Sequence, residues 1–205
     1  MTTVVLVHGW GYDASLWDAV RAKLSVDATI IDLGFYGAVP PPPTFAEPVI
    51  AVGHSLGALW WLTQSGIPWR KLLSINGFPR FTEAADYAPA IAPRVLARML
   101  QQFARDPAAV LADFHARCGG HAPPGTPDIA RLAVGLDWLA QWDGRATLAA
   151  RRAKVFALSS THDPIVPAAM SAMAFGTVES IDAPGHLLPL SHPKLCAQWI
   201  ERLAA

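Results

Sequence analysis

The sequence has few cysteines, no excess of either charge and no long apolar run, and each of these absences excludes a class of protein. Two cysteines in 205 residues cannot form a disulfide framework, which favours a reducing compartment. Sixteen basic residues balance sixteen acidic ones, so the basic excess of a typical nucleic-acid-binding protein is missing. No apolar stretch approaches the ~20 residues that a membrane-spanning helix needs.

The amino-terminal sequence MTTVVLVHGW also lacks the features of a secretory signal. It has neither a basic start nor a long apolar core. We therefore expect a cytoplasmic protein that binds neither nucleic acid nor membrane. Nothing in the sequence specifies an oligomeric state.

Hydrophobic residues are abundant, at 52% of the chain, which is enough for a large core in one domain. Short β-branched runs alternate with helical patterns, and this alternation predicts an α/β fold with a mostly parallel sheet. The expected strands are nearly continuous apolar runs, as in strands that are buried on both faces. They cover residues 3–7, 28–32, 49–52, 71–75, 154–159 and 177–181. Helices are expected over residues 14–24 and 56–64.

The strand rhythm stops between residues 78 and 145, where the pattern is helical. We interpret this segment as a helical cap inserted into a core formed by residues 1–77 and 146–205. Four consecutive prolines at 40–43 exclude a helix or a central strand there. They are interpreted as a stiff connection, with a ligand for another domain as the alternative.

The stretch GHSLG at residues 53–57 carries the clearest chemical signal. Glycines two residues before and two residues after Ser55 leave room for a strand and a helix to approach each other. A strand, the pattern G-x-S-x-G and a helix together form a nucleophile elbow, in which a tight turn exposes the serine hydroxyl. Ser55 is therefore the predicted nucleophile.

A serine nucleophile needs a base and an acid that orients the base, and in this arrangement they follow in the order Ser, acid, His. Asp163 and His186 lie in loops directly after two later predicted strands. Parallel strands bring such loops to one edge of the sheet. We assign Ser55, Asp163 and His186 as the catalytic residues, with Asp182 as the rival acid.

The oxyanion of an acyl intermediate needs two N–H donors. The residue after the nucleophile, Leu56, supplies one, and a loop after an earlier strand supplies the other. The loop HGWG at residues 8–11 places the Trp10 N–H suitably. We expect His8 to shape this loop through hydrogen bonds.

The stretches VLVHGWGYDASLW, VGHSLG, HDPIVP and PGHLLPLSHP together resemble the α/β-hydrolase superfamily across nearly the whole chain. Trp10, the cap and GLDWLAQWDGRATL at 135–148 are similar to the pimeloyl-[acyl-carrier-protein] methyl ester esterases of biotin synthesis. Two features depart from the superfamily pattern. Its usual first two strands are absent, and DLGFYG stands where Asp-Leu-Pro-Gly-x-Gly is usual. The resemblance thus implies an α/β-hydrolase fold with a reduced sheet of about six strands.

The same resemblance implies a serine carboxylic ester hydrolase that releases methanol from a pimeloyl-acyl-carrier-protein substrate, without a cofactor. A short-chain carboxylesterase or a carbon–carbon hydrolase could use the same residues. A lyase and a non-catalytic binding module on this fold are further alternatives. His115 and His121 flank Cys118, but no carboxylate or second cysteine completes a metal site.

Residues 89–106 form an amphipathic pattern within the predicted cap. Arg94, Arg98 and Arg105 fall on one side of a helix, and apolar residues fall on the other. Such a stripe is in most proteins a solvated face, and the alternative is a docking surface for an acidic carrier protein. On that alternative the three arginines bind the carrier, whereas Trp10, Met99 and Phe103 bind the acyl substrate.

Overall fold

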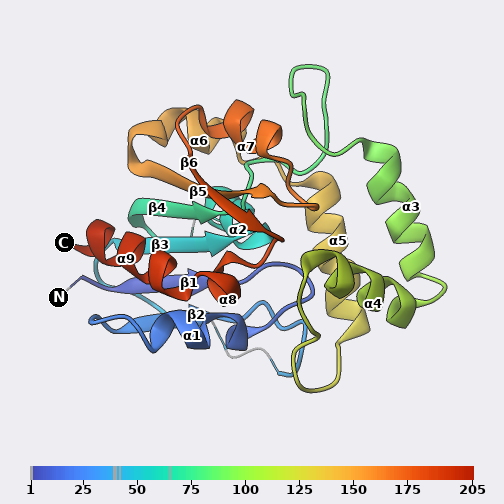
Figure 1. Cartoon of the computed structure of the whole chain (residues 1–205), viewed down its shortest axis with the longest axis horizontal. Helices are drawn as coiled ribbons and strands as arrows, with labels where there is room; N and C mark the ends of the chain where they lie inside the picture. The colour runs from blue at the N-terminus through green and yellow to red at the C-terminus, as the bar shows by residue number, and fades with distance from the viewer. Residues whose placement is uncertain (1, 39–40, 42, 65) are drawn as a thin grey trace.

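A six-stranded parallel sheet forms the centre of the molecule in the computed structural model, which describes residues 2–38, 41, 43–64 and 66–205 (Figure 1). The strand order is β2-β1-β3-β4-β5-β6. The strands are β1 (Val4–Val7), β2 (Ala28–Ile31), β3 (Val49–His54), β4 (Trp69–Ile75), β5 (Val155–His162) and β6 (Glu179–Pro184). All six predicted strands are confirmed. Pro40 and Pro42 of the predicted connection lie outside the described residues.

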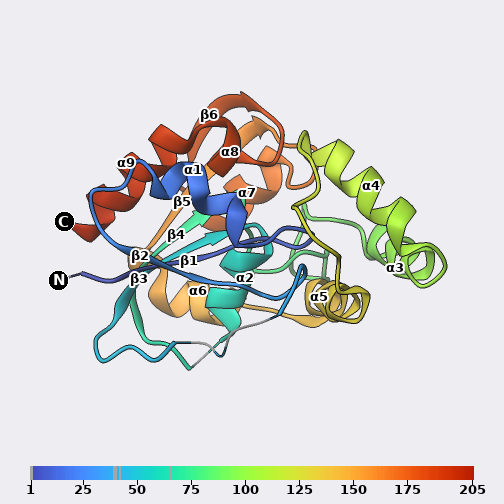
Figure 2. The same ribbon diagram turned by 90° about the horizontal axis from the view of Figure 1, so that it is seen from below.

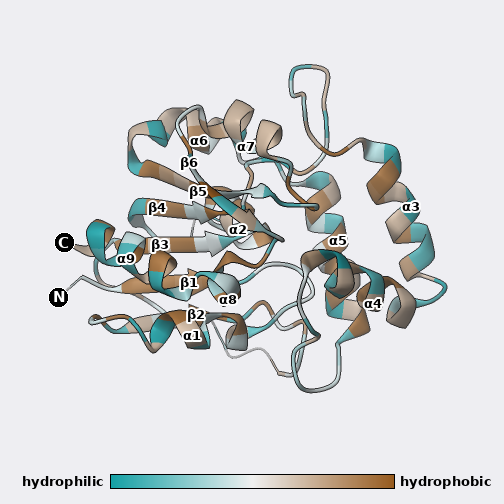
Figure 3. Ribbon diagram, in the orientation of Figure 1, coloured by the Kyte–Doolittle hydropathy of each residue, from teal (hydrophilic) through white to brown (hydrophobic). Residues whose placement is uncertain are grey.

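Strands β1 and β3 form the centre of the core because nearly all of their residues are apolar. Every residue of β1 and of β3 is buried, and the strand ribbons are largely brown in the hydropathy view (Figure 3). Strands without alternating polar positions must be covered on both faces. Figure 2 shows helices on both sides of the sheet.

Helices α1, α8 and α9 lie on one face of the sheet, and α2 and α6 lie on the other (Figure 2). The helices are α1 (Asp18–Arg21), α2 (Leu56–Thr63), α3 (Pro93–Phe103), α4 (Pro107–Cys118), α5 (Ile129–Gln141), α6 (Arg145–Arg151), α7 (Ala168–Phe175), α8 (Leu188–Ser191) and α9 (Pro193–Ala204). Short 3-10 helices cover Ala14–Trp17 and Arg152–Lys154. None of the helices within the described residues is both long enough and apolar enough to cross a bilayer.

The single helix predicted over residues 14–24 is wrong in its length and type. A 3-10 turn, capped by the Asp13 carboxylate on the Ser15 N–H, leads into the one-turn helix α1. The chain then leaves the helical path, and the N–H of Ser25 donates to the Glu201 carboxylate at 2.7 Å. The α-helix has already ended before this point, because the N–H groups of Lys23 and Leu24 donate three residues back instead of four.

The helices α3, α4 and α5 lie beyond the carboxyl ends of the strands, opposite the two chain termini (Figure 1). They belong to the segment of residues 78–145, called here the inserted segment. Pro93 begins α3, so the helix is shorter than the amphipathic pattern, and Arg105 lies in the turn that follows it. The division into core and cap stays a prediction.

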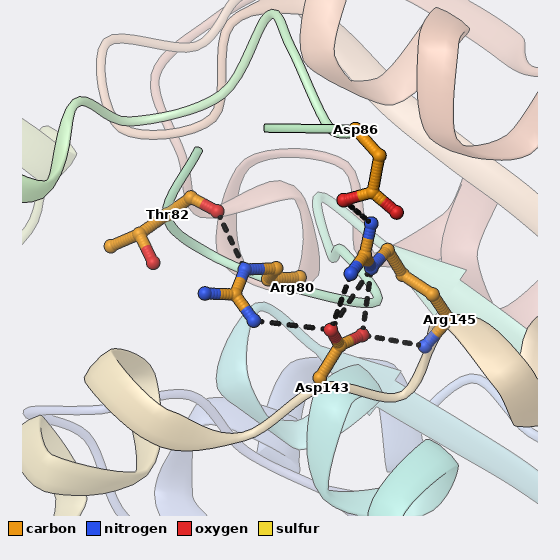
Figure 4. A network of polar contacts seen from close by, with 5 residues as sticks. All are labelled: Arg80, Thr82, Asp86, Asp143 and Arg145. Atoms are coloured by element: carbon orange, nitrogen blue, oxygen red, sulfur yellow. Dashed lines mark hydrogen bonds and ion pairs between the residues drawn. The ribbon is translucent and has the colours of Figure 1, made fainter. Parts of the chain in front are cut away.

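The two ends of the inserted segment are joined to each other by polar contacts (Figure 4). The N–H of Gly144 donates to the Pro79 carbonyl at 2.7 Å. The Arg145 guanidinium contacts Asp143 at 2.7 Å and Asp86 at 2.8 Å. Hydrogen bonds from Arg145 are the main cause that lowers the pKa of Asp143 to about 2.

Helix α2 packs against β1 and β3 so closely that only glycine fits at two positions. A Cβ atom on Gly57 would lie 2.2 Å from the Val7 carbonyl oxygen, and one on Gly53 would lie 2.4 Å from the Ala58 nitrogen. Both are backbone atoms, which a rotamer change cannot move. The sequence pattern around Ser55 is therefore a packing requirement of the sheet itself.

We expect Gly57→Ala to lower the stability of the protein. Overpacking at a rigid site costs about 1–3 kcal/mol, and each kcal/mol shifts the Tm of a domain of this size by roughly 2–4 °C. Gly66→Ala is the matched control, because a Cβ there meets nothing within 4 Å. Thermal unfolding of both variants provides the measurement. Equal Tm values for the two would contradict the packing argument.

Candidate active site

Ser55 occupies a strained turn between β3 and α2. Its φ is 54° and its ψ is −121°, a backbone conformation that non-glycine residues rarely adopt. The turn is held at both ends. The Ser55 N–H donates to the Ile75 carbonyl at 3.0 Å, and the Ala58 N–H donates to the Ser55 carbonyl at 3.0 Å. The geometry is that of the predicted nucleophile elbow, with Ser55 6% exposed.

The structure brings Asp163 and His186 together from two loops. The Asp163 Oδ2 atom lies 2.7 Å from His186 Nδ1. Its other oxygen accepts hydrogen bonds from the N–H groups of Ile165 and Val166 at 2.7 and 2.9 Å. Both side chains of the pair are almost completely buried. The carboxylate is therefore fixed in one orientation, with one oxygen turned to the histidine.

The rival acid Asp182 lies elsewhere. Its carboxylate pairs with His162 at 3.2 Å, and both side chains are exposed. Asp163, rather than Asp182, contacts the ring of His186. In the sequence, Asp163 lies in a separate loop after β5, whereas Asp182 lies at a strand end beside His186, a less usual place for the orienting acid, and this difference separated the two.

His186 keeps one ring nitrogen free beside the elbow. With Nδ1 on Asp163, the remaining Nε2 is buried and has no hydrogen-bond partner among the described residues. The His186 ring lies 4.7 Å from the ring of His54, the residue before Ser55. Within the described part of the chain the structure records no hydrogen bond between this nitrogen and the Ser55 hydroxyl. Asp163 and His186 are in direct contact, and Ser55 follows His54, whose ring packs against that of His186.

The loop after β1 passes directly alongside Ser55. A Cβ on Gly9 would lie 2.9 Å from the Ser55 Cβ, so the backbone leading to Trp10 runs beside the elbow. Leu56 is the first residue of α2, where helical N–H groups have no intrahelical acceptor. The structure thus brings both predicted oxyanion donors to the neighbourhood of Ser55.

His8 holds this loop by hydrogen bonds, as expected. It is fully buried, with Nδ1 2.9 Å from the Gly9 carbonyl oxygen. The Leu33 N–H donates to its Nε2 atom at 2.9 Å. The ring therefore bridges the loop after β1 to the loop after β2.

Two of the three residues predicted to bind substrate, Trp10 and Phe103, are in contact with each other. The Trp10 ring packs edge-on against Phe103 of α3, with 5.9 Å between centroids. Its indole N–H donates to the Leu132 carbonyl of α5 at 2.8 Å. Met99, one helical turn before Phe103, lines the groove between α3 and α4 together with the arginines.

This groove runs between α3 and α4 and has a volume of about 830 Å³. Its lining contains more arginines than aspartates, together with several apolar side chains. The lining side chains are Arg94, Arg98, Arg105, Arg117, Asp106, Asp113, Gln102, Val95, Met99, Ala109, Val110 and Phe114. All three arginines predicted to bind a carrier thus face one groove. None of Ser55, Asp163 and His186 lines it.

Sequence reasoning missed the contacts of His54 and Asn76. His54 was treated as the variable position of the elbow, yet its Nε2 lies 2.9 Å from the His186 carbonyl oxygen. Asn76 donates to the same oxygen at 2.7 Å. The only signal for Asn76 was a polar residue and a glycine directly after an apolar strand. Burial and the ring of His186 hold the pKa of His54 well below 6.5.

Two curated proteins are similar to this chain in sequence. A biotin biosynthesis bifunctional protein, BioHC, from Cellvibrio japonicus is 29% identical over 81% of this chain, which spans 39% of that protein. A pimeloyl-[acyl-carrier protein] methyl ester esterase from Aromatoleum aromaticum is 28% identical over 97% of this chain and 96% of its own length. The chain therefore spans well under half of the bifunctional relative.

Solved structures share the fold at lower sequence identity. An esterase from Exiguobacterium antarcticum superimposes with a TM-score of 0.76 at 17% identity, covering 100% of this chain and 92% of that one. A hydrolase from Oleispira antarctica has a TM-score of 0.73 at 17% identity, covering 98% and 91%. The sequence profile of the alpha/beta hydrolase family matches residues 4–199. The chain belongs to the alpha/beta hydrolase family.

Proposed function

We propose that the protein is a serine ester hydrolase in which Ser55 is the nucleophile, His186 the base and Asp163 the orienting acid. The observation that carries the proposal is the buried Asp163–His186 contact at 2.7 Å next to a serine with a strained backbone. A structural serine gives no reason for such strain, whereas a nucleophile must project its hydroxyl. The esterase names of the relatives support the same reaction class.

The mechanism follows from the roles of the three residues. Ser55 Oγ attacks the acyl carbonyl while Nε2 of His186 accepts its proton. The N–H groups of Trp10 and Leu56 bind the oxyanion, and each such donor is worth about 3–4 kcal/mol. His186 then protonates the departing alcohol. Water hydrolyses the acyl-enzyme through the same base. Asp163 keeps the proton of the neutral ring on Nδ1 and stabilises the imidazolium.

Ser55→Ala is expected to lower kcat for p-nitrophenyl esters by about 10³-fold or more, because the triad acts as a unit. Assays with acetyl to octanoyl esters measure the loss. A fluorophosphonate should label the wild type at one serine and leave the variant unmodified. A wild type without turnover and without an adduct would instead indicate the non-catalytic binding module.

The two candidate acids make a matched pair of variants. Asp163→Asn should reduce kcat by about 10³–10⁴-fold, since an amide can donate to Nδ1 and so favours the wrong tautomer of the neutral ring. Asp182→Asn changes an exposed carboxylate whose polar partners among the described residues are His162 and Thr161, and it should leave kcat unchanged. Steady-state kinetics on one ester compare them. A large loss for Asp182→Asn alone would reverse the assignment.

For the substrate, we propose the methyl ester of a pimeloyl group on an acyl carrier protein. Two sequence relatives carry this activity in their names and match most of this chain. The arginine-rich groove between α3 and α4 offers an acidic carrier a complementary surface. Methanol release from the carrier-linked ester would identify this activity. A short-chain carboxylesterase would prefer free esters, and a carbon–carbon hydrolase would turn over a β-diketone faster than either.

Charge reversal in the groove tests the carrier separately from the chemistry. Combined Arg94→Glu and Arg98→Glu should raise KM for the carrier-linked ester about tenfold at low salt, which corresponds to about 1.4 kcal/mol. Constants for p-nitrophenyl butyrate should not change. Arg21→Glu on α1, outside the groove, is the control. An unchanged carrier KM would mean that this arginine face is only a solvated surface.

A further inference from the structure

The polar groups of His186 are held by four different parts of the chain. Its N–H donates to the Cys118 carbonyl at the end of α4, at 3.2 Å. Its carbonyl accepts from His54 at 2.9 Å and from Asn76 at 2.7 Å. Its Nδ1 contacts Asp163. Among the described residues only Nε2 has no partner, and this nitrogen must reach the serine.

Asn76 links the His186 loop to the strand that carries the acid. It follows β4 with a φ of 46° and is 1% exposed. Its side-chain oxygen accepts the Ser160 N–H of β5 at 2.8 Å, while its amide N–H donates to the His186 carbonyl. Asparagine tolerates this left-handed backbone better than most residues. The side chain thus connects β5, which ends just before Asp163, to the base.

His54 links the same carbonyl to the nucleophile turn. It is fully buried, and its low pKa keeps it neutral, with a single ring N–H. Because the acceptor is a carbonyl, that proton must be on Nε2. The other nitrogen, Nδ1, has no partner in the described part of the chain. One tautomer is therefore selected, and it serves only the His186 contact.

We propose that His54 and Asn76 are positioning residues, whose two donors fix the His186 carbonyl and so direct Nε2 toward Ser55. This inference rests on the proposed serine hydrolase function. A carbonyl held by two buried donors from β3 and from the end of β4 cannot rotate without losing both hydrogen bonds. Small displacements of a catalytic group lower the reaction rate strongly. A displacement of ~1 Å can reduce the rate about 10²-fold.

The test compares His54→Leu, which removes the donor, with His54→Gln, whose amide nitrogen can replace Nε2. His54→Leu should lower kcat for a p-nitrophenyl ester about 10- to 10²-fold with little change in KM. His54→Gln should recover most of that loss. Asn76→Gly, which suits the positive φ, should behave like His54→Leu. Ser74→Ala is the control, because Ser74 is equally buried on β4 and its hydroxyl has no partner among the described residues.

A spectroscopic readout separates the positioning role from the proposed function. The proton between His186 Nδ1 and Asp163 should give a strongly downfield ¹H resonance, which Asp163→Asn identifies. Broadening of this resonance in His54→Leu and Asn76→Gly, and its retention in His54→Gln, supports the proposal even if the wild type hydrolyses no ester tested. An intact resonance with wild-type kcat overturns it. Equal losses in His54→Gln and His54→Leu also overturn it, because the donor then plays no part.

Discussion

The close approach of α2 to β1 across the Ser55 turn is the constraint on which the rest of the site depends. It requires glycine at positions 53 and 57, since a Cβ at either would meet backbone atoms. It also forces Ser55 to a positive φ. If α2 lay farther from β1, the turn could relax and the Ser55 hydroxyl would take a different position. Packing in the centre of the sheet therefore determines where the proposed nucleophile lies.

The parallel sheet supplies the other components at the same edge. The loops after β1, β4, β5 and β6 lie at the carboxyl edge of the sheet, as Ser55 does. Each loop supplies a group to the contacts that surround the site. The backbone after β1 passes the serine, Asn76 follows β4, Asp163 follows β5 and His186 follows β6. No single loop holds the arrangement. Contacts between loops do so, chiefly those that converge on His186.

Much of this arrangement could be predicted from local sequence. The glycines around Ser55 and the apolar strands are patterns of adjacent residues, and the order Ser, Asp, His follows from the strands that each residue comes after. The preference for Asp163 over Asp182 depended on local position, since Asp182 lies at a strand end beside His186, and Asp163 is the acid that contacts the His186 ring. Short-range patterns suffice where backbone geometry decides which residue type fits.

The contacts that were missed join residues far apart in the chain. The His186 carbonyl meets His54 across 132 positions and Asn76 across 110. His54 occupies the variable position of the G-x-S-x-G motif, which carries no expectation for that side chain, and Asn76 belongs to no recognisable motif. The helix predicted over 14–24 is interrupted too, and the chain after it is tied to α9 by the contact between the Ser25 N–H and Glu201. Tertiary hydrogen bonds of this kind leave no periodic trace in the sequence.

Hydrogen bonds join the inserted segment to the loops that surround Ser55. His115 of α4 lies 2.7 Å from the Gly11 carbonyl, and Trp10 donates to the Leu132 carbonyl of α5. Cys118, at the end of α4, accepts the His186 N–H. A shift of α4 or α5 would therefore break these hydrogen bonds or displace the loop that carries the proposed oxyanion donor or the loop that carries the proposed base. The inserted helices are thus part of what fixes the candidate site, and not only a cover above it.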